Sequence, residues 1–138
     1  MPVTNRSSGN AFERRFCAML AERGFWAHNM AQSACGQPAD VIAVKGRTVW
    51  LIDCKVCSND RFDLKRVEPN QLTAMDLWTT KCPYEPYFAL ELSEGAVFMV
   101  GYGTIQEFLA DDRMTMSHVD IHRKGIPFAA WVSGVNLL

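Results

Sequence analysis

The sequence predicts an α/β fold in which helices and strands follow the order α-β-β-β-α-β-β-α. Three observations lead to this prediction. Apolar residues recur at helical spacing over 12–20, two β-branched runs flank a turn at 45–47, and two further apolar runs, 87–92 and 96–102, follow a segment that begins with a proline. Apolar residues three or four apart predict a helix, whereas short β-branched runs bounded by turn residues predict strands.

Length and composition are those of one globular unit. The chain has 138 residues, 49% of them hydrophobic and 21% charged, which is typical of a soluble domain. We expect a single domain over 1–138, with a core at about 9–112 and a C-terminal extension, 113–138, that covers the sheet or forms a dimer interface. No apolar run could span a bilayer and no signal sequence is present, so we expect a cytoplasmic protein without membrane contact. The five cysteines favour reduced thiols over a disulfide framework.

The first predicted helix begins near Asn10 and ends at Gly24. Glu13 borders its apolar stripe, and two interpretations of this residue are open. Asn10 with a glutamate three positions later resembles a capping box, whereas a carboxylate beside the apolar face could also belong to a functional site.

The segment 38–55 carries the most informative pattern in the chain. Two β-branched runs flank Lys45-Gly46-Arg47 and predict a hairpin. Side chains alternate along a strand, so Asp53 and Lys55 share one face. Asp40 begins the partner strand, which the hairpin brings alongside. Two carboxylates and one ammonium therefore converge, and a buried strand rarely carries such groups without a partner or a task.

The second half of the sequence contains one more strong helix signal. Pro69 occupies the first position of a predicted helix that extends to Lys81. Gln71 near its start could cap the helix. A short helix, 105–110, is expected after Thr104, whereas the segment that follows has no clear pattern.

Two other motifs invite a metal or redox interpretation. His118 and His122 have helical spacing, but no glutamate lies between them and no third ligand is apparent, so we do not expect a zinc site. Cys54 and Cys57 have no second cysteine pair to answer them, and we expect them to pack in the core.

Charge is distributed unevenly along the chain. The net charge is −1, yet residues 1–66 contain ten Lys and Arg against six Asp and Glu, whereas 67–138 contain four against nine. Positive charge gathered on one face would allow a neutral protein to bind a polyanion, although chance explains the same counts. The cations that we select as candidates for contact with nucleic acid are Arg6, Arg14, Arg61, Lys65 and Arg66. A solvated surface loop is the alternative interpretation of 61–66.

The acidic pair at 40 and 53 suits a particular chemistry. Carboxylates are preferred ligands of Mg²⁺ and Mn²⁺. Such an ion lowers the pKa of a bound water and offsets charge on a phosphate under attack. A lysine beside the acids can hold that water and stabilise developing charge. These are the requirements of phosphodiester hydrolysis.

At these residues the chain resembles a known family. Pro38-Ala39-Asp40, twelve intervening residues and Asp53-Cys54-Lys55 are similar to the PD-(D/E)xK nuclease signature. The resemblance implies a restriction-endonuclease-like core, a central mixed sheet flanked by helices. Within that superfamily, the chain resembles Holliday junction resolvases of the RecU and archaeal Hjc type. Glu13 matches their first-helix glutamate, Gln71 matches a glutamine of RecU-like members, and 62–67 is also RecU-like.

The resemblance implies a role for each residue of the site. Asp40 and Asp53 would be metal ligands, Glu13 a direct or outer ligand, and Lys55 and Gln71 would position the water. We therefore expect a Mg²⁺-dependent (or Mn²⁺-dependent) DNA endonuclease that acts as a homodimer on Holliday junctions or other branched DNA.

Three alternatives to a junction resolvase stay open. A nuclease of the same fold could act on duplex DNA in restriction or repair. A catalytically silent DNA-binding protein could keep the fold, and a structural subunit would fit the acidic C-terminal half.

Overall fold

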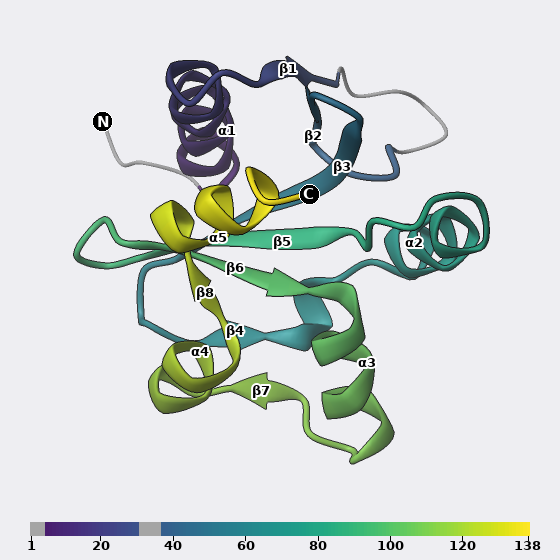
Figure 1. Ribbon diagram of the computed structural model, residues 1–138. Coiled ribbons are helices and arrows are strands. Elements are labelled where there is room, and N and C mark those ends of the chain that lie inside the picture. The colour runs from purple at the N-terminus through teal and green to yellow at the C-terminus, as the bar shows by residue number, and fades with distance from the viewer. Residues whose placement is uncertain (1–4, 31–36) are drawn as a thin grey trace.

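A computed structural model describes residues 5–30 and 37–138 and contains a central six-stranded mixed sheet with helices on both faces (Figure 1). The strand order is β1-β2-β3-β5-β6-β8. The sheet consists of β1 (Trp26–Asn29), β2 (Val41–Lys45), β3 (Thr48–Cys57), β5 (Tyr87–Leu92), β6 (Val97–Gly101) and β8 (Ile126–Pro127). A separate two-stranded sheet pairs β4 (Phe62–Asp63) with β7 (Thr115–Met116). The predicted α/β class with a central mixed sheet is confirmed.

Five α-helices accompany the sheets in the described part of the chain. They are α1 (Asn5–Glu22), α2 (Pro69–Lys81), α3 (Tyr102–Ala110), α4 (His118–Lys124) and α5 (Phe128–Val135), and a short 3-10 helix, η1 (Leu64–Arg66), follows β4. Neither of the two described segments contains a helix with the length and apolar character needed to cross a membrane.

The sheet separates two apolar cores. Side chains of α1 and α5 pack with one face of the sheet, and side chains of α2, α3 and α4 pack with the other. Strand β3 contributes to both cores, because Trp50 and Ile52 face the first and Leu51 and Cys57 face the second. A strand covered on both faces is apolar on both faces, which explains the continuous apolar run in its sequence.

Strand β3 is longer than its antiparallel partner β2. Gly46 has a φ of +59° in the hairpin turn, a conformation that glycine adopts without a steric penalty. From this turn the pairing extends to Val41 opposite Ile52, where β2 begins. Beyond Ile52, β3 continues to Cys57, and its other edge pairs in parallel with β5. The functional site described below lies where β2 and β3 part.

Two helix starts differ from the sequence prediction. Helix α1 already includes Asn5, so Asn10 lies inside it and cannot serve as the predicted N-cap. The capping-box interpretation of Glu13 is therefore wrong. Helix α3 begins at Tyr102 after Gly101, earlier than the predicted cap at Thr104. Asn10 and Thr104 resemble N-caps but lie inside their helices. Local sequence alone therefore misplaces the starts of these two helices.

The C-terminal helix α5 covers one face of the sheet. Trp131 is only 4% exposed. Its ring lies 5.7 Å from that of Phe25, 5.3 Å from Trp50 and 5.7 Å from Tyr87. Aromatic pairs at these separations contribute beyond the burial of their area. The pattern-poor end of the sequence therefore contributes directly to the core.

We expect Trp131→Ala to lower the free energy of unfolding by about 3–5 kcal/mol, because the truncation leaves a cavity among three aromatic rings. Urea denaturation of the purified protein measures the change. Leu137→Ala is the matched control: Leu137 is 88% exposed, and its truncation should change stability by less than about 0.5 kcal/mol. Equal effects of the two substitutions would contradict the role of α5 as cover.

Candidate functional site

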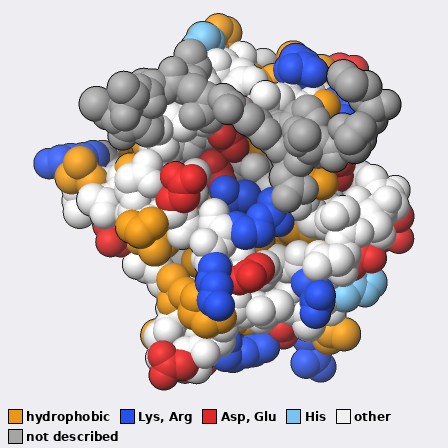
Figure 2. Space-filling view, turned by 180° about the vertical axis from the view of Figure 1, so that it is seen from behind, with side chains coloured by type: hydrophobic (Ala, Val, Ile, Leu, Met, Phe, Trp, Pro, Cys, Tyr) orange, Lys and Arg blue, Asp and Glu red, His pale blue; other side chains and the backbone are white. Residues whose placement is uncertain are grey.

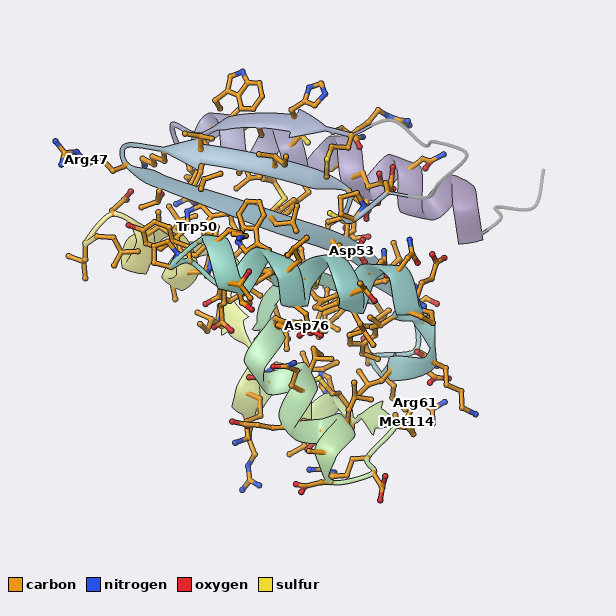
Figure 3. All side chains as sticks on the ribbon, turned by 90° about the vertical axis from the view of Figure 1, so that its right-hand side faces the viewer. Arg47, Trp50, Asp53, Arg61, Asp76 and Met114 are labelled. Carbon is orange, nitrogen blue, oxygen red and sulfur yellow. The ribbon has the colours of Figure 1, made fainter. Side chains whose placement is uncertain are left out.

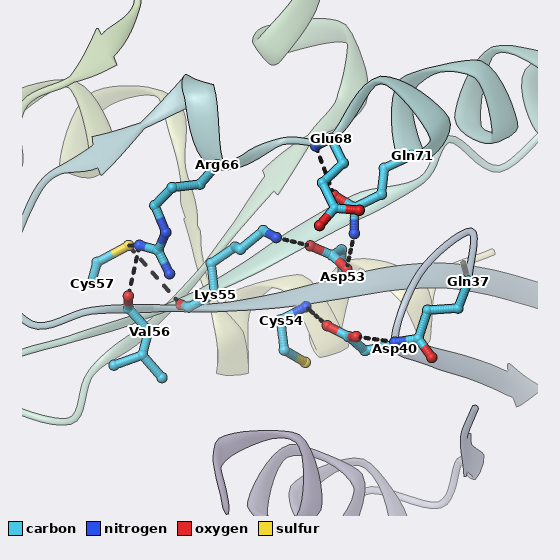
Figure 4. A network of polar contacts seen from close by, with 10 residues as sticks. All are labelled: Gln37, Asp40, Asp53, Cys54, Lys55, Val56, Cys57, Arg66, Glu68 and Gln71. Atoms are coloured by element: carbon cyan, nitrogen blue, oxygen red, sulfur yellow. Dashed lines mark hydrogen bonds and ion pairs between the residues drawn. The ribbon is translucent and has the colours of Figure 1, made fainter. Parts of the chain in front are cut away.

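Where β2 diverges from β3, polar backbone and side-chain groups gather around Asp40. The Asp40 amide donates to the Ile52 carbonyl oxygen at 3.1 Å, in line with the ladder. Two residues further along β3, the Cys54 amide donates to Asp40 Oδ2 at 2.8 Å (Figure 4). A side-chain oxygen thus replaces the strand partner that β3 loses. Gln37 Nε2 donates to the other carboxylate oxygen at 2.7 Å.

Asp53 is buried completely beneath the start of α2 (Figure 3). Gln71 Nε2 donates to its Oδ1 at 2.9 Å, and Lys55 Nζ lies 3.0 Å from its Oδ2. Lys55 and Asp53 are two residues apart on one strand, so alternation places both side chains on the same face. Among the described residues, Asp53 Oδ2 has this ion pair but accepts no hydrogen bond. A buried oxygen with spare acceptor capacity is suited to a cation.

Gln71 serves two purposes at once. Its Oε1 accepts from the Glu68 amide at 3.2 Å, which caps the helix, while its Nε2 donates to Asp53. Pro69 at the first helical position fixes where α2 begins. The sequence leaves capping and a place in the site as alternatives for this residue, and in the structure its amide group does both.

Two acids of the site hold protons more tightly than free carboxyls do. Burial, followed by the negative charge of Asp40, raises the pKa of Asp53 to about 8. Burial and then Asp40 also raise the pKa of Glu13 on α1 to about 7, against opposing effects of Lys55 and Arg14. Glu13 thus belongs to the same electrostatic environment although it comes from the opposite face of the sheet. Like charges at short range with little solvent favour either protonation or a bound cation.

The acidic residues fit a divalent metal ion on these grounds. Asp40 and Asp53 present carboxylate oxygens at adjacent strand positions. Glu13 is close enough for the charge of Asp40 to raise its pKa. Asp53 Oδ2 can accept a further interaction. All the side-chain ligands available are oxygens, the donor set that Mg²⁺ and Mn²⁺ prefer. Lys55 is the cation that contacts Asp53, and a bound metal ion would offset the charge of the other acids.

The predicted DNA-contacting cations fall into two groups. Arg61 and Arg66 line a pocket of about 330 Å³ together with Asn59, Asp63 and Thr115. Figure 2 shows basic side chains gathered beside acidic ones on one face of the molecule. Arg66 also donates to the Val56 carbonyl oxygen at 2.8 Å, which ties the segment after β4 to β3. Lys65 is exposed on η1.

The remaining two cations belong to α1. Arg14 is exposed, and its charge lowers the pKa of Glu13, so it lies near the site. The side chain of Arg6 lies outside the described part of the structure.

Two partners of Asp40 and a possible third ligand for the histidines become visible only in the structure. The Cys54 amide reaches Asp40 only through the divergence of the strands, and Gln37, three residues before Asp40, belongs to no motif that marks it as a partner. The sequence shows no third ligand for His118 and His122, but the structure brings Glu94, on the turn between β5 and β6, within reach of both. Cys54 and Cys57 face opposite cores, as expected of packing residues.

Comparisons with known proteins show what this chain is similar to. The model of the family described as archaeal Holliday junction resolvase (hjc) matches residues 4–135. The chain is also similar to the solved structure of Hjc from Archaeoglobus fulgidus, a Holliday junction resolvase from an archaeal hyperthermophile, with 21% sequence identity and a TM-score of 0.71. That similarity covers 90% of this chain and 99% of the other. No curated protein matches.

The raised pKa of Asp53 predicts how stability depends on pH in the metal-free protein. Between about pH 4 and pH 8 the unfolded chain releases a proton that the folded chain keeps, because the pKa rises from 3.8 to about 8 on folding. The free energy of unfolding therefore falls as pH rises through this range. Asp53→Asn removes the ionisation. In EDTA, we expect its stability relative to the wild type to improve by at least about 1.4 kcal/mol between pH 5 and pH 9, the equivalent of one pKa unit.

Urea denaturation at the two pH values measures this difference, with Asp112→Asn as the control. Asp112 is exposed and has a φ of +57° that asparagine tolerates. A relative stability of Asp53→Asn that does not change with pH would contradict the assignment of a raised pKa to Asp53.

Proposed function

Because the chain belongs to the archaeal Holliday junction resolvase (Hjc) family, we propose that Asp40, Asp53 and Lys55 form the centre at which it cuts DNA. Members of this family are metal-dependent endonucleases that hydrolyse phosphodiester bonds, and this chain is a nuclease of branched DNA. The observation that carries the proposal is the network at the divergence of β2 and β3: two carboxylates and an ammonium, with Asp53 fully buried.

Asp40 and Asp53 would hold the metal ion, and Mg²⁺ (or Mn²⁺) is the ion that their oxygens favour. When bound, it supplies Lewis-acid stabilisation of the phosphate and lowers the pKa of a bound water. The Cys54 amide and Gln37 fix both oxygens of Asp40, so the carboxylate is oriented before a substrate arrives. Glu13 completes the acidic set from the side of α1. A cation would lower the raised pKa values of Asp53 and Glu13 and keep both acids ionised.

Lys55 acts on the water and on the reacting phosphate. Its ammonium is held 3.0 Å from Asp53 Oδ2, and its side chain is only 15% exposed. From that position it can orient a water for attack on phosphorus and stabilise the negative charge that develops as the P–O bond breaks. Hydrogen bonding from three ammonium protons allows it to contact Asp53 and the reacting oxygens together.

Gln71 is a positioning residue. Its side-chain Nε2 donates to Asp53 Oδ1, while its side-chain Oε1 accepts from the Glu68 amide and so fixes the first turn of α2. Groups that orient metal ligands commonly affect metal affinity or activity by about 10–100-fold when removed. The same contact couples the position of α2 to the orientation of the Asp53 carboxylate.

The pocket lined by Arg61 and Arg66 is the proposed contact with the DNA backbone. Guanidinium groups bind phosphate with two parallel hydrogen bonds, and phosphate contacts fix the register of a protein on DNA without reading bases. Lys65 and Arg14 extend this positive charge on either side. Strand β3 connects the two features: Asp53 lies near its C-terminal end, and Arg61 and Arg66 belong to the segment that follows it.

A resolvase must cut two strands of one junction. Two-fold symmetry of the protein would present two identical centres to the DNA, so we propose a homodimer. A cytoplasmic location stays a prediction. The expected dimer has twice the 15.5 kDa mass of the chain, which sedimentation equilibrium distinguishes from a monomer.

Lys55→Ala should lower the rate of junction cleavage by at least about 10²–10³-fold, because the charge that develops on the phosphate loses its ammonium partner. The assay uses a labelled four-way junction with Mg²⁺ or EDTA, beside linear duplex and single-stranded DNA. Junction binding should change by less than about tenfold, since one phosphate contact at most is lost. Lys45→Ala is the matched control, because Lys45 Nζ bonds to the Arg23 carbonyl oxygen away from the site.

Paired symmetrical cuts in the junction, lost in EDTA and in Lys55→Ala, would support this assignment and the dimer. Full activity of a folded Lys55→Ala protein would refute the proposed centre. Equal cutting of the duplex would indicate a nuclease without preference for branched DNA.

Arg61→Ala should weaken junction binding and reduce the slope of log K against log salt by about one, because one phosphate contact is removed. Fluorescence anisotropy over a salt series measures both quantities. Arg47→Ala is the control, since Arg47 lies at the hairpin tip, at the opposite end of β3 from Arg61 (Figure 3). An equal loss of slope in both variants would show that the pocket makes no special contact.

A further inference from the structure

A second set of metal-ligating side chains lies at the turn between β5 and β6. Glu94 belongs to this turn, and His118 and His122 are one helical turn apart on α4. One ligand atom from each residue lies within 4.8 Å of the others. The two histidine Nε2 atoms are 3.0 Å apart, and all three side chains are exposed. The catalytic carboxylates do not belong to this set.

Local contacts fix the turn that carries Glu94 and the ring of His122 before any ligand binds. Asp60 accepts hydrogen bonds from the amide and the hydroxyl of Ser93, both at 2.8 Å, and so fixes the turn that carries Glu94. Asp60 itself has a φ of +60°, a conformation that aspartate and asparagine tolerate better than most residues. The ring of His122 packs 4.6 Å from that of Phe98 on β6. Two independent contacts therefore connect the turn and α4 to the rest of the fold.

The geometry is close to what a four-coordinate metal ion needs. Ligand nitrogens about 2.05 Å from a tetrahedral Zn²⁺ ion are about 3.3 Å apart, near the separation of the two Nε2 atoms. Without a cation, two ring nitrogens at this distance form a hydrogen bond only when one donates and the other accepts. The exposed Glu94 side chain is free to rotate by the small amount that brings a carboxylate oxygen to bonding distance.

We propose that Glu94, His118 and His122 bind a transition-metal ion of the Zn²⁺ type, with water as the remaining ligand. Two imidazoles and one carboxylate suit Zn²⁺, Ni²⁺ or Cu²⁺, whereas Mg²⁺ prefers oxygen ligands and keeps its water. The ion would join the β5–β6 turn to α4 and so hold the C-terminal part of the chain on the sheet.

This site is separate from the proposed catalytic centre. Asp53 pairs with Phe88 in the β3–β5 ladder, and Glu94 follows six residues later, beyond the end of β5. Strand residues advance about 3.3 Å each, so the two sites lie well beyond the reach of one ion. Metal binding by Glu94, His118 and His122 can therefore be tested separately from the nuclease mechanism.

The test is a calorimetric titration of the full chain with Zn²⁺, by wild type and variants. We expect His118→Ala to bind one equivalent of Zn²⁺ fewer than the wild type, and Glu94→Gln to bind that equivalent at least about tenfold more weakly. His28→Ala is the matched control for loss of a surface histidine, since His28 is exposed on β1, and it should bind as the wild type does. Asp53→Asn should also keep this equivalent, which separates it from any Zn²⁺ at the catalytic centre.

Thermal unfolding gives a second readout. Zn²⁺ should raise the melting temperature of the wild type but not that of His118→Ala, because ligand binding to the folded state stabilises it. Equal Zn²⁺ stoichiometry in the wild type and His118→Ala would overturn the proposal, as would the same loss in His28→Ala. If His118→Ala does not fold, Glu94→Gln decides the question, because replacing this exposed carboxylate by an amide of the same shape leaves the fold intact.

Discussion

The burial of the Asp53 carboxylate is the constraint on which the site depends. A charge without exposed surface is costly unless other groups compensate for its lost hydration. Lys55 supplies an opposite charge, and Gln71 supplies a hydrogen bond from the start of α2. These two partners have different origins, one from the same strand and one from a helix across the core. The site therefore forms only when α2 is correctly placed on β3.

The unequal lengths of β2 and β3 explain why polar chemistry occurs in the middle of an apolar sheet. While two strands remain paired, their backbone amides satisfy each other. Past Ile52 the Cys54 amide has no partner on β2, and Asp40 Oδ2 takes that place. The parallel pairing of β3 with β5 continues on the other edge and keeps β3 rigid. Divergence on one edge and continuity on the other together create a fixed acidic site.

The two candidate metal sites illustrate how donor type and surroundings separate functions. Burial raises the pKa of Asp53, and the acids of this site gain from a hard cation that neutralises their repulsion. The exposed imidazole nitrogens on α4 suit a softer ion. If the first site is the proposed catalytic centre, stability and activity conflict there, because like charges that favour metal binding weaken the metal-free fold. At the second site a bound ion would only add to stability.

Local periodicity in the sequence determined the hairpin, the common face of Asp53 and Lys55, and the start of α2 at Pro69. Each of these depends on the backbone repeat of a single element, which neighbouring residues specify. The same reasoning failed for Asn10, because a residue that resembles a cap lies inside a longer helix. Tertiary structure alone decided that Gln37 and the Cys54 amide hold Asp40, and that Glu94 meets His118 and His122. The contacts of the Cys54 amide and of Glu94 arise from strand divergence and from packing between elements far apart in the chain, which no local pattern encodes. Gln37 lies only three residues before Asp40, but it belongs to no motif that marks it as a partner.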